Sequence, residues 1–283
     1  MRQGGCGTVL AVLAALALGA PVQAGQWSGR SLEVFAGSAS KPALEAAARR
    51  FEGETGARVF LHLGGSGTVL SQMELLRRGD VYFPGSSDYM ELAKRKGLVD
   101  APTEVRVVYL IPAINVQRGN PKKIHDLEDL ARPGLRVGIA RPETVCVGLY
   151  AVEALEARGL TEAVLKNVVN QAESCEKTAQ MISMGLVDAV IGWDVFEEWD
   201  PDRVETVYYP PDEVTRIGYI PAAVSAFPRE PELARAFLAY LVSAEGQKIF
   251  RAHGYLTDLA EARKRARPDT PVGGEWPLPA SWR

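Results

Sequence analysis

The sequence predicts an α/β fold of two lobes, each a mostly parallel sheet flanked by helices, joined by two crossing strands. A length of 283 residues corresponds to roughly two domains of average size. Short apolar segments alternate with helical patterns along most of the chain, which is typical of parallel sheets. Two extended apolar segments, 105–115 and 217–226, are each interrupted by a proline and bracket a central block. We therefore expect the second lobe to be inserted into the first.

The first 24 residues have the pattern of an export signal rather than of a folded segment. Arg2 is the only early charge, an apolar and small-residue run covers 8–20, and Val22-Gln23-Ala24 follows. This order matches a charged region, a hydrophobic region and an A-x-A-like cleavage site, so we expect cleavage after Ala24 and a periplasmic product. The run is shorter than the ~20 residues that span a bilayer, so an uncleaved anchor is disfavoured.

The first lobe is expected to begin with three successive strand-and-helix units. Pro42 stands in the first turn of the first helix with Ser40 shortly before it, which is a typical helix start. Gly56 ends this helix, and loops rich in Gly and Ser precede the other two. The expected strands are 31–35, 57–63 and 80–83, and the expected helices are 43–55, 69–78 and 89–96.

The central block repeats this alternation. Its expected strands are 135–140, 167–170 and 187–193, with helices over 148–157 and 174–184. After the second crossing, a helical run from Pro231 to Phe250 is expected to pack back on the first lobe. The predicted units are the signal peptide (1–24), lobe 1 (25–108 and 224–260), lobe 2 (109–223) and a C-terminal tail (261–283).

The composition narrows the class of function. Hydrophobic residues make up 47% and charged residues 24%, which is ordinary for a globular protein. The 32 basic and 35 acidic residues give a net charge of −3 without any long block of like charge. A surface that binds nucleic acid should be basic, so we expect no nucleic-acid partner. No Ser, His and acidic trio or metal-water site emerges at plausible spacing, so we expect no enzyme.

Small residues follow four predicted strands, at the points where helices begin. Such helix starts present unpaired N–H groups and the positive end of the helix dipole, which suits an anion. Ligands of parallel α/β sheets bind outside these strand ends. Ser and Thr at helix starts are also ordinary caps, and the residues alone leave both interpretations open. The four junctions are Ser38/Ser40, Ser66/Thr68, Cys146/Val147 and Ser174/Cys175.

Several segments together resemble the molybdate-binding periplasmic proteins of ABC importers. They are VFAGSASKPALEAAARRFEGETG, LHLGGSGTVLSQM, RPETVCVGLYAVEAL, SCEKTAQMISMGLVDAVIGWD and LARAFLAYLVSAEGQKIF, and the resemblance spans about residues 31–255. It implies a type II periplasmic binding protein fold whose lobes close over a small tetrahedral oxyanion, molybdate or tungstate. It also implies delivery to a membrane permease and its ATPase, by a monomer without a cofactor.

The resemblance assigns two ligand positions to the first lobe. The family's first-loop serine falls at Ala39 in an ungapped alignment, so either Ser38 or Ser40 supplies the hydroxyl. The second-loop serine corresponds to Ser66.

In the second lobe, the resemblance places backbone N–H donors at Val147 and Cys175. The family's ligand tyrosine falls at Trp193, which is a departure because an indole N–H is a longer and differently placed donor. Tyr150 is expected to pack rather than to bind.

The two cysteines of the mature chain, Cys146 and Cys175, are a second departure. In an oxidising compartment they could form a disulfide, which is the favoured interpretation. They could instead be free thiols that line the cleft and suit a thiophilic ligand, such as a soft metal ion or an arsenite-like species, or they could simply pack. No His lies beside them, so no metal site is expected.

Two other functions remain open at this point. The same fold could serve as a periplasmic ligand sensor for a receptor kinase. An exported hydrolase would use Ser38 or Ser66 as its nucleophile. The sequence also leaves open whether molybdate, tungstate or another ligand is bound.

Overall fold

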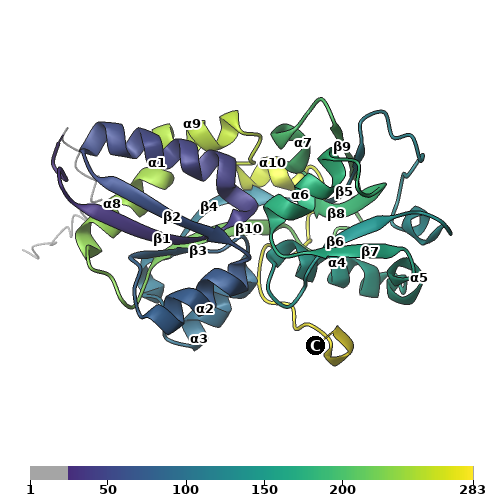
Figure 1. The fold of residues 1–283 in the computed structure, drawn as a ribbon, viewed down its shortest axis with the longest axis horizontal. Coiled ribbons are helices and arrows are strands. Elements are labelled where there is room, and N and C mark those ends of the chain that lie inside the picture. Colours follow the sequence, from purple (N-terminus) through teal and green to yellow (C-terminus); the bar gives the residue numbers. More distant parts are fainter. Residues whose placement is uncertain (1–24, 283) are drawn as a thin grey trace, which may run out of the picture.

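The computed structural model describes residues 25–282, which form two lobes side by side along the long axis of the molecule (Figure 1). Each lobe is built around one five-stranded sheet. The predicted signal peptide and its cleavage after Ala24 lie outside the described residues. Within residues 25–282, no helix is long and apolar enough to cross a membrane.

The first lobe contains a sheet of order β2-β1-β3-β10-β4. β1 runs parallel to β2 and β3, whereas β10 is antiparallel to both β3 and β4. The strands are β1 (Ser31–Gly37), β2 (Arg58–Gly64), β3 (Val81–Phe83), β4 (Val105–Leu110) and β10 (Gly218–Val224).

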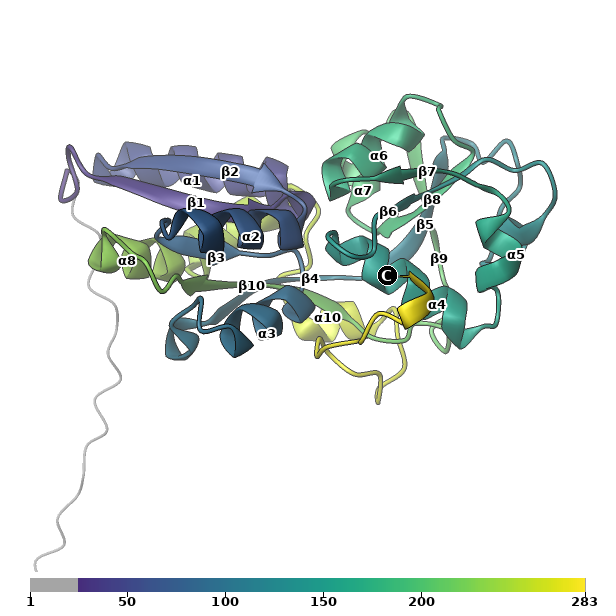
Figure 2. The same ribbon diagram turned by 60° about the horizontal axis from the view of Figure 1, so that its bottom comes forward.

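Helices cover both faces of this sheet (Figure 2). α1, α8 and α9 contact one another in one layer, and α2 and α3 contact each other in another. α1 begins with Pro42 in its first turn and ends at Gly56, whose φ of 75° is the left-handed conformation that glycine adopts easily. The helices are α1 (Lys41–Thr55), α2 (Ser66–Leu76), α3 (Ser87–Arg95), α8 (Pro231–Leu241) and α9 (Ala244–Ala252).

The second lobe contains a sheet of order β7-β6-β8-β5-β9, with α4 and α6 on its two faces. β6 is parallel to β7 and β8, and β5 is antiparallel to β8 and β9. Its strands are β5 (Pro112–Gln117), β6 (Val137–Ala140), β7 (Val168–Ala172), β8 (Ala189–Trp193) and β9 (Val204–Tyr208). Its helices are α4 (Cys146–Ala157), α5 (Thr161–Leu165), α6 (Cys175–Ser183) and α7 (Phe196–Trp199).

The chain passes between the lobes twice. β4 of the first sheet continues through Ile111 directly into β5 of the second, and the chain returns by the segment 209–217 into β10. The predicted boundary at residue 223 falls inside β10, which pairs entirely within the first sheet. In each sheet one strand, β10 in the first and β5 in the second, runs opposite to the other four, so both sheets are mixed and most of their strands point the same way, as predicted. The predicted α/β fold of two lobes is confirmed.

The segment after α10 (Leu259–Arg263) runs back across the junction of the lobes (Figure 2). Ile217 of the second crossing donates its N–H to Pro271 and accepts from the N–H of Gly273. Ser87 at the start of α3 donates its hydroxyl to the Gly274 carbonyl at 2.7 Å. The predicted peripheral tail therefore packs against the hinge before it ends in a short 3-10 turn at Ala280–Trp282.

Candidate ligand-binding site between the lobes

The four junctions singled out in the sequence lie where the two lobes meet. Two come from the first lobe, at the 3-10 turn after β1 and at the start of α2, and two from the second, at the starts of α4 and α6. Each predicted ligand residue is at most 2% exposed: Ser38, Ser40, Ser66, Val147, Cys175 and Trp193.

Hydrogen bonds between the lobes show that the structure is closed. The Ser38 hydroxyl oxygen accepts from the N–H of Glu176 at 3.2 Å, which joins the loop after β1 to the start of α6. The N–H of Gly67 donates to the Thr144 carbonyl at 2.9 Å. At the rim of the cleft, Lys41 and Glu176 form a salt bridge of 2.5 Å. The helix starts of opposite lobes are thus in direct contact.

The two candidate hydroxyls of the first loop have different surroundings. Ser40 donates to the carbonyl of Gly37 in its own loop at 3.3 Å. Ser38 instead reaches α6 of the other lobe. Neither serine caps the helix that follows it. Of the two, Ser38 faces the opposite lobe.

Ser66 is held at the base of the cleft by its own lobe. Its hydroxyl oxygen accepts from the N–H of Gly85 at 2.9 Å, and its carbonyl accepts from the Tyr82 hydroxyl at 2.9 Å. A side chain at residue 37 or 85 would not fit, because a Cβ on Gly37 would lie 2.6 Å from the Ser66 Oγ and one on Gly85 would lie 2.5 Å from the Cys146 Sγ. Gly37 therefore lets the loops of the first lobe pack closely around Ser66, and Gly85 lets Cys146 of the second lobe approach.

At one of the four junctions, the serine is an ordinary helix cap: Ser174 caps α6. Its hydroxyl accepts from the N–H of Lys177 at 3.1 Å and so caps α6. No side chain caps α2 or α4, and the N–H of Gly67 in the first turn of α2 donates to the Thr144 carbonyl of the other lobe. The capping interpretation therefore holds for Ser174 but not for Ser66.

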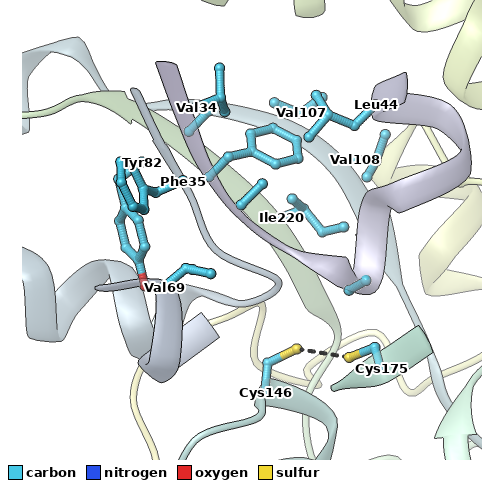
Figure 3. Close-up of a cluster of buried hydrophobic side chains, with 14 of the residues drawn as sticks. Val34, Phe35, Leu44, Val69, Tyr82, Val107, Val108, Cys146, Cys175 and Ile220 are labelled. Carbon is cyan, nitrogen blue, oxygen red and sulfur yellow. Dashed lines mark hydrogen bonds between the residues drawn. The ribbon is translucent and has the colours of Figure 1, made fainter. Parts of the chain in front are cut away.

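Cys146 and Cys175 are free, buried thiols whose sulfur atoms lie 3.5 Å apart (Figure 3). A disulfide would bring them to about 2.05 Å, so the predicted disulfide is not present in this structure and its formation stays a prediction. Burial raises the pKa of the Cys175 thiol well above its ordinary value. The N–H of Val147 and the indole of Trp193, which lie near this sulfur, act in the opposite direction on that pKa.

Trp193 has no oxygen or nitrogen partner for its buried indole N–H. Its ring packs against Tyr150 with centroids 4.7 Å apart, and the guanidinium of Arg216 lies 4.0 Å from the Tyr150 ring centre on the other side. Tyr150 is completely buried, and within the described residues its hydroxyl has no hydrogen-bond partner, so its packing role stays a prediction.

A buried ionic cluster lies next to this aromatic pair. Arg216, on the second crossing, contacts Asp88 of the first lobe at 2.9 Å and Glu153 of the second at 2.6 Å. Burial raises the pKa of Glu153, and the guanidinium of Arg216 opposes that rise. Asp88 also accepts from the N–H of Trp276 in the tail at 2.9 Å. The sequence does not reveal this cluster, since its members are far apart along the chain.

Asp194, which directly follows β8, is also held by structural contacts. It accepts from the N–H groups of Ile111 and Val195, each at 3.1 Å, and burial raises its pKa to about 7. Among the described residues, no group of three or more His, Cys, Asp and Glu side chains could hold a metal ion.

Two lobes in contact over a set of buried helix starts are the architecture of a protein that binds a ligand between its lobes. The sequence pattern of the bacterial extracellular solute-binding protein family matches residues 32–256, and the chain belongs to this family. The family consists of binding proteins rather than enzymes, as the sequence predicted.

Known proteins with similar chains include molybdate and sulfate binders. A Haemophilus influenzae protein named only as a binding protein is 27% identical over 234 residues, covering 80% of this chain and 90% of that one. The molybdate-binding protein ModA of Mycobacterium tuberculosis is 26% identical over 238 residues, covering 80% and 84%. The solved sulfate-binding protein SubI of M. tuberculosis superposes with a TM-score of 0.74 at 19% identity, covering 87% and 93%.

Proposed function

We propose that this protein captures a small tetrahedral oxyanion between its lobes and delivers it to an ABC importer, with molybdate or tungstate as the leading ligand. The observation that carries the proposal is the meeting of helix starts from both lobes at a buried point lined by neutral donors. Relatives named as molybdate-binding proteins support this ligand class.

The proposed donors come from both lobes. In the first lobe they are the hydroxyls of Ser38 and Ser66, with Ser38 preferred to Ser40 because it faces the other lobe. In the second lobe they are the N–H groups of Val147 and Cys175 and the indole of Trp193. Neutral donors suit a dianion because each hydrogen bond to a charged group contributes about 1.5–3 kcal/mol without adding a charge to the empty site.

The proposed mechanism is stabilisation of the closed state by the ligand. The donors of the two lobes reach one ligand only when the lobes meet, so the anion binds the closed form more tightly than the open form. We propose that a membrane permease and its ATPase recognise this closed form through the rims of both lobes, and that the protein acts in the periplasm as a monomer.

Titration of the mature protein with molybdate, tungstate, sulfate and phosphate tests the proposal, with thermal unfolding as the readout. At about 100 times the dissociation constant, a ligand should stabilise the fold by about 2.7 kcal/mol, which raises the melting temperature measurably. We expect molybdate and tungstate to produce this rise. The absence of a shift with all four anions would contradict the proposal.

The variant Ser66→Ala tests the site itself. Removal of one hydrogen bond to a charged ligand should weaken binding by about 1.5–3 kcal/mol, or roughly 10- to 150-fold in Kd. Isothermal titration calorimetry measures this change. Ser71→Ala is a matched control, since Ser71 lies on the exposed side of the same helix. Equal affinity of Ser66→Ala and the control would place the ligand elsewhere.

A further inference from the structure

The two thiols give the cleft a chemistry that oxyanion binding does not use. Cys146 opens α4 and Cys175 opens α6, so both belong to the second lobe and both lie at its surface toward the first. Their side chains point toward each other (Figure 3), with the sulfur atoms 3.5 Å apart. Gly85 of the first lobe covers Cys146, because a Cβ there would lie 2.5 Å from its sulfur. Opening of the lobes therefore uncovers the thiol pair.

The distance between the two sulfur atoms limits the coordination geometry of any atom that could bridge them. An atom bonded to both sulfurs at about 2.3 Å, the length of a zinc–thiolate bond, would subtend about 100° across the observed 3.5 Å. A linear two-coordinate metal ion would need the sulfurs about 4.6 Å apart at the same bond length. A tetrahedral ion would need two further ligands, and the described residues hold no cluster of three or more His, Cys, Asp and Glu. A pyramidal three-coordinate centre fits best.

The surroundings of the thiols suit a hydroxyl group as the third ligand of such a centre. Within the described residues, the buried indole N–H of Trp193 has no hydrogen-bond partner. Trp193 and the N–H of Val147 lie near the Cys175 sulfur, since both act to lower the pKa of this thiol. An oxygen attached to the bridging atom would give these donors an acceptor. Burial raises the pKa of the Cys175 thiol, which favours a neutral oxyacid whose leaving hydroxyl groups take up the thiol protons as water over a cation that requires thiolates.

We propose that Cys146 and Cys175 bind trivalent arsenic, as the neutral oxyacid As(OH)₃, within the cleft that the proposed function assigns to the solute. Two S–H bonds and two As–O bonds break, two As–S bonds form, and two molecules of water leave. The arsenic stays trivalent, so no oxidant or reductant takes part. The remaining As–OH oxygen accepts a hydrogen bond from Trp193. This inference relies on the proposed function in one respect, namely that the solute binds in this cleft.

Titration of the mature protein with sodium arsenite tests the proposal, in parallel with molybdate and sulfate. The protein is first reduced with a phosphine, because a dithiol reductant would itself bind arsenite. Native mass spectrometry should show the mass of one As(OH)₃ less two waters, and both thiols should become unreactive toward a thiol reagent. The variants Cys146→Ser and Cys175→Ser should each weaken arsenite binding at least 100-fold while retaining the fold.

Each outcome separates this inference from the proposed function. Arsenite binding that either serine variant abolishes supports the dithiol site, whether or not molybdate binds. Molybdate or sulfate binding without arsenite binding to the reduced protein overturns the inference and leaves the proposed function standing. Arsenite binding that persists in both serine variants also overturns it. If the reduced protein binds none of the three, the inference and the proposed function both fail.

Discussion

At the scale of single residues, the closed structure distinguishes side chains that the sequence treats as equivalent. Ser38 and Ser40 are both small, buried and next to the aligned position Ala39. They differ only in direction, because Ser38 contacts α6 of the other lobe whereas Ser40 contacts the Gly37 carbonyl of its own loop. No propensity or spacing encodes this direction, which depends on how the 3-10 turn after β1 presents its side chains.

The pair Ser38→Ala and Ser40→Ala tests this difference. Ser38→Ala should weaken oxyanion binding by about 1.5–3 kcal/mol, because it removes a hydrogen bond to a charged ligand. Ser40→Ala should leave affinity nearly unchanged and cost about 1 kcal/mol of stability, the value of an ordinary hydrogen bond. Calorimetric titration with molybdate and urea unfolding measure the two effects. A larger loss of affinity in Ser40→Ala would reverse the assignment.

At the scale of elements, the sequence predicts helix starts better than it predicts interruptions and short elements. The helical run expected over 231–250 is two helices, α8 and α9, since the Ser243 hydroxyl accepts from the N–H of Gly246 and begins a new helix. The strand β9 was not predicted, because its pairing with β5 decides it rather than its own pattern. The junctions that form the site were found because glycine, serine and proline mark them locally.

The buried carboxyl of Asp194, at the end of β8, predicts how the stability of the protein depends on pH. Its pKa is raised from an ordinary 3.8 to about 7 by burial, so between these values the folded protein holds a proton that the unfolded chain has released. Stability from this group is complete below pH 3.8 and is lost as pH rises toward 7. Between pH 4.5 and pH 7.5 the unmodified protein should lose unfolding free energy through this group. Asp194→Asn should lose a few kcal/mol less over the same range, because its side chain has no proton to release.

Urea unfolding at several pH values measures that dependence. Asp269→Asn is the matched control, because this carboxylate is largely exposed and should leave the pH dependence as in the unmodified protein. If Asp194→Asn and the control show the same dependence, the buried carboxyl is not the group that titrates.

At the scale of the whole molecule, the parts that sequence reasoning missed are those that join the lobes. Arg216 contacts one carboxylate from each lobe, and the tail adds a hydrogen bond from Trp276 to Asp88. Residues 88, 153 and 216 carry no local pattern, and only the completed fold brings them together. Since the cluster spans both lobes and the crossing segment, we expect it to favour the closed arrangement.

The variant Arg216→Met tests whether this cluster controls closure as well as stability. It leaves two buried carboxylates without their cationic partner, which should cost about 3–5 kcal/mol of unfolding free energy. Their repulsion should also separate the lobes, so small-angle scattering without ligand should give a larger radius of gyration. The triple variant Asp88→Asn, Glu153→Gln, Arg216→Met removes the charges together and should regain most of the stability. A triple variant that is stable but open would show that the ion pairs hold the lobes closed. If Arg216→Met instead unfolds more easily but stays as compact as the unmodified protein, the cluster supports the fold, and closure depends on the ligand site alone.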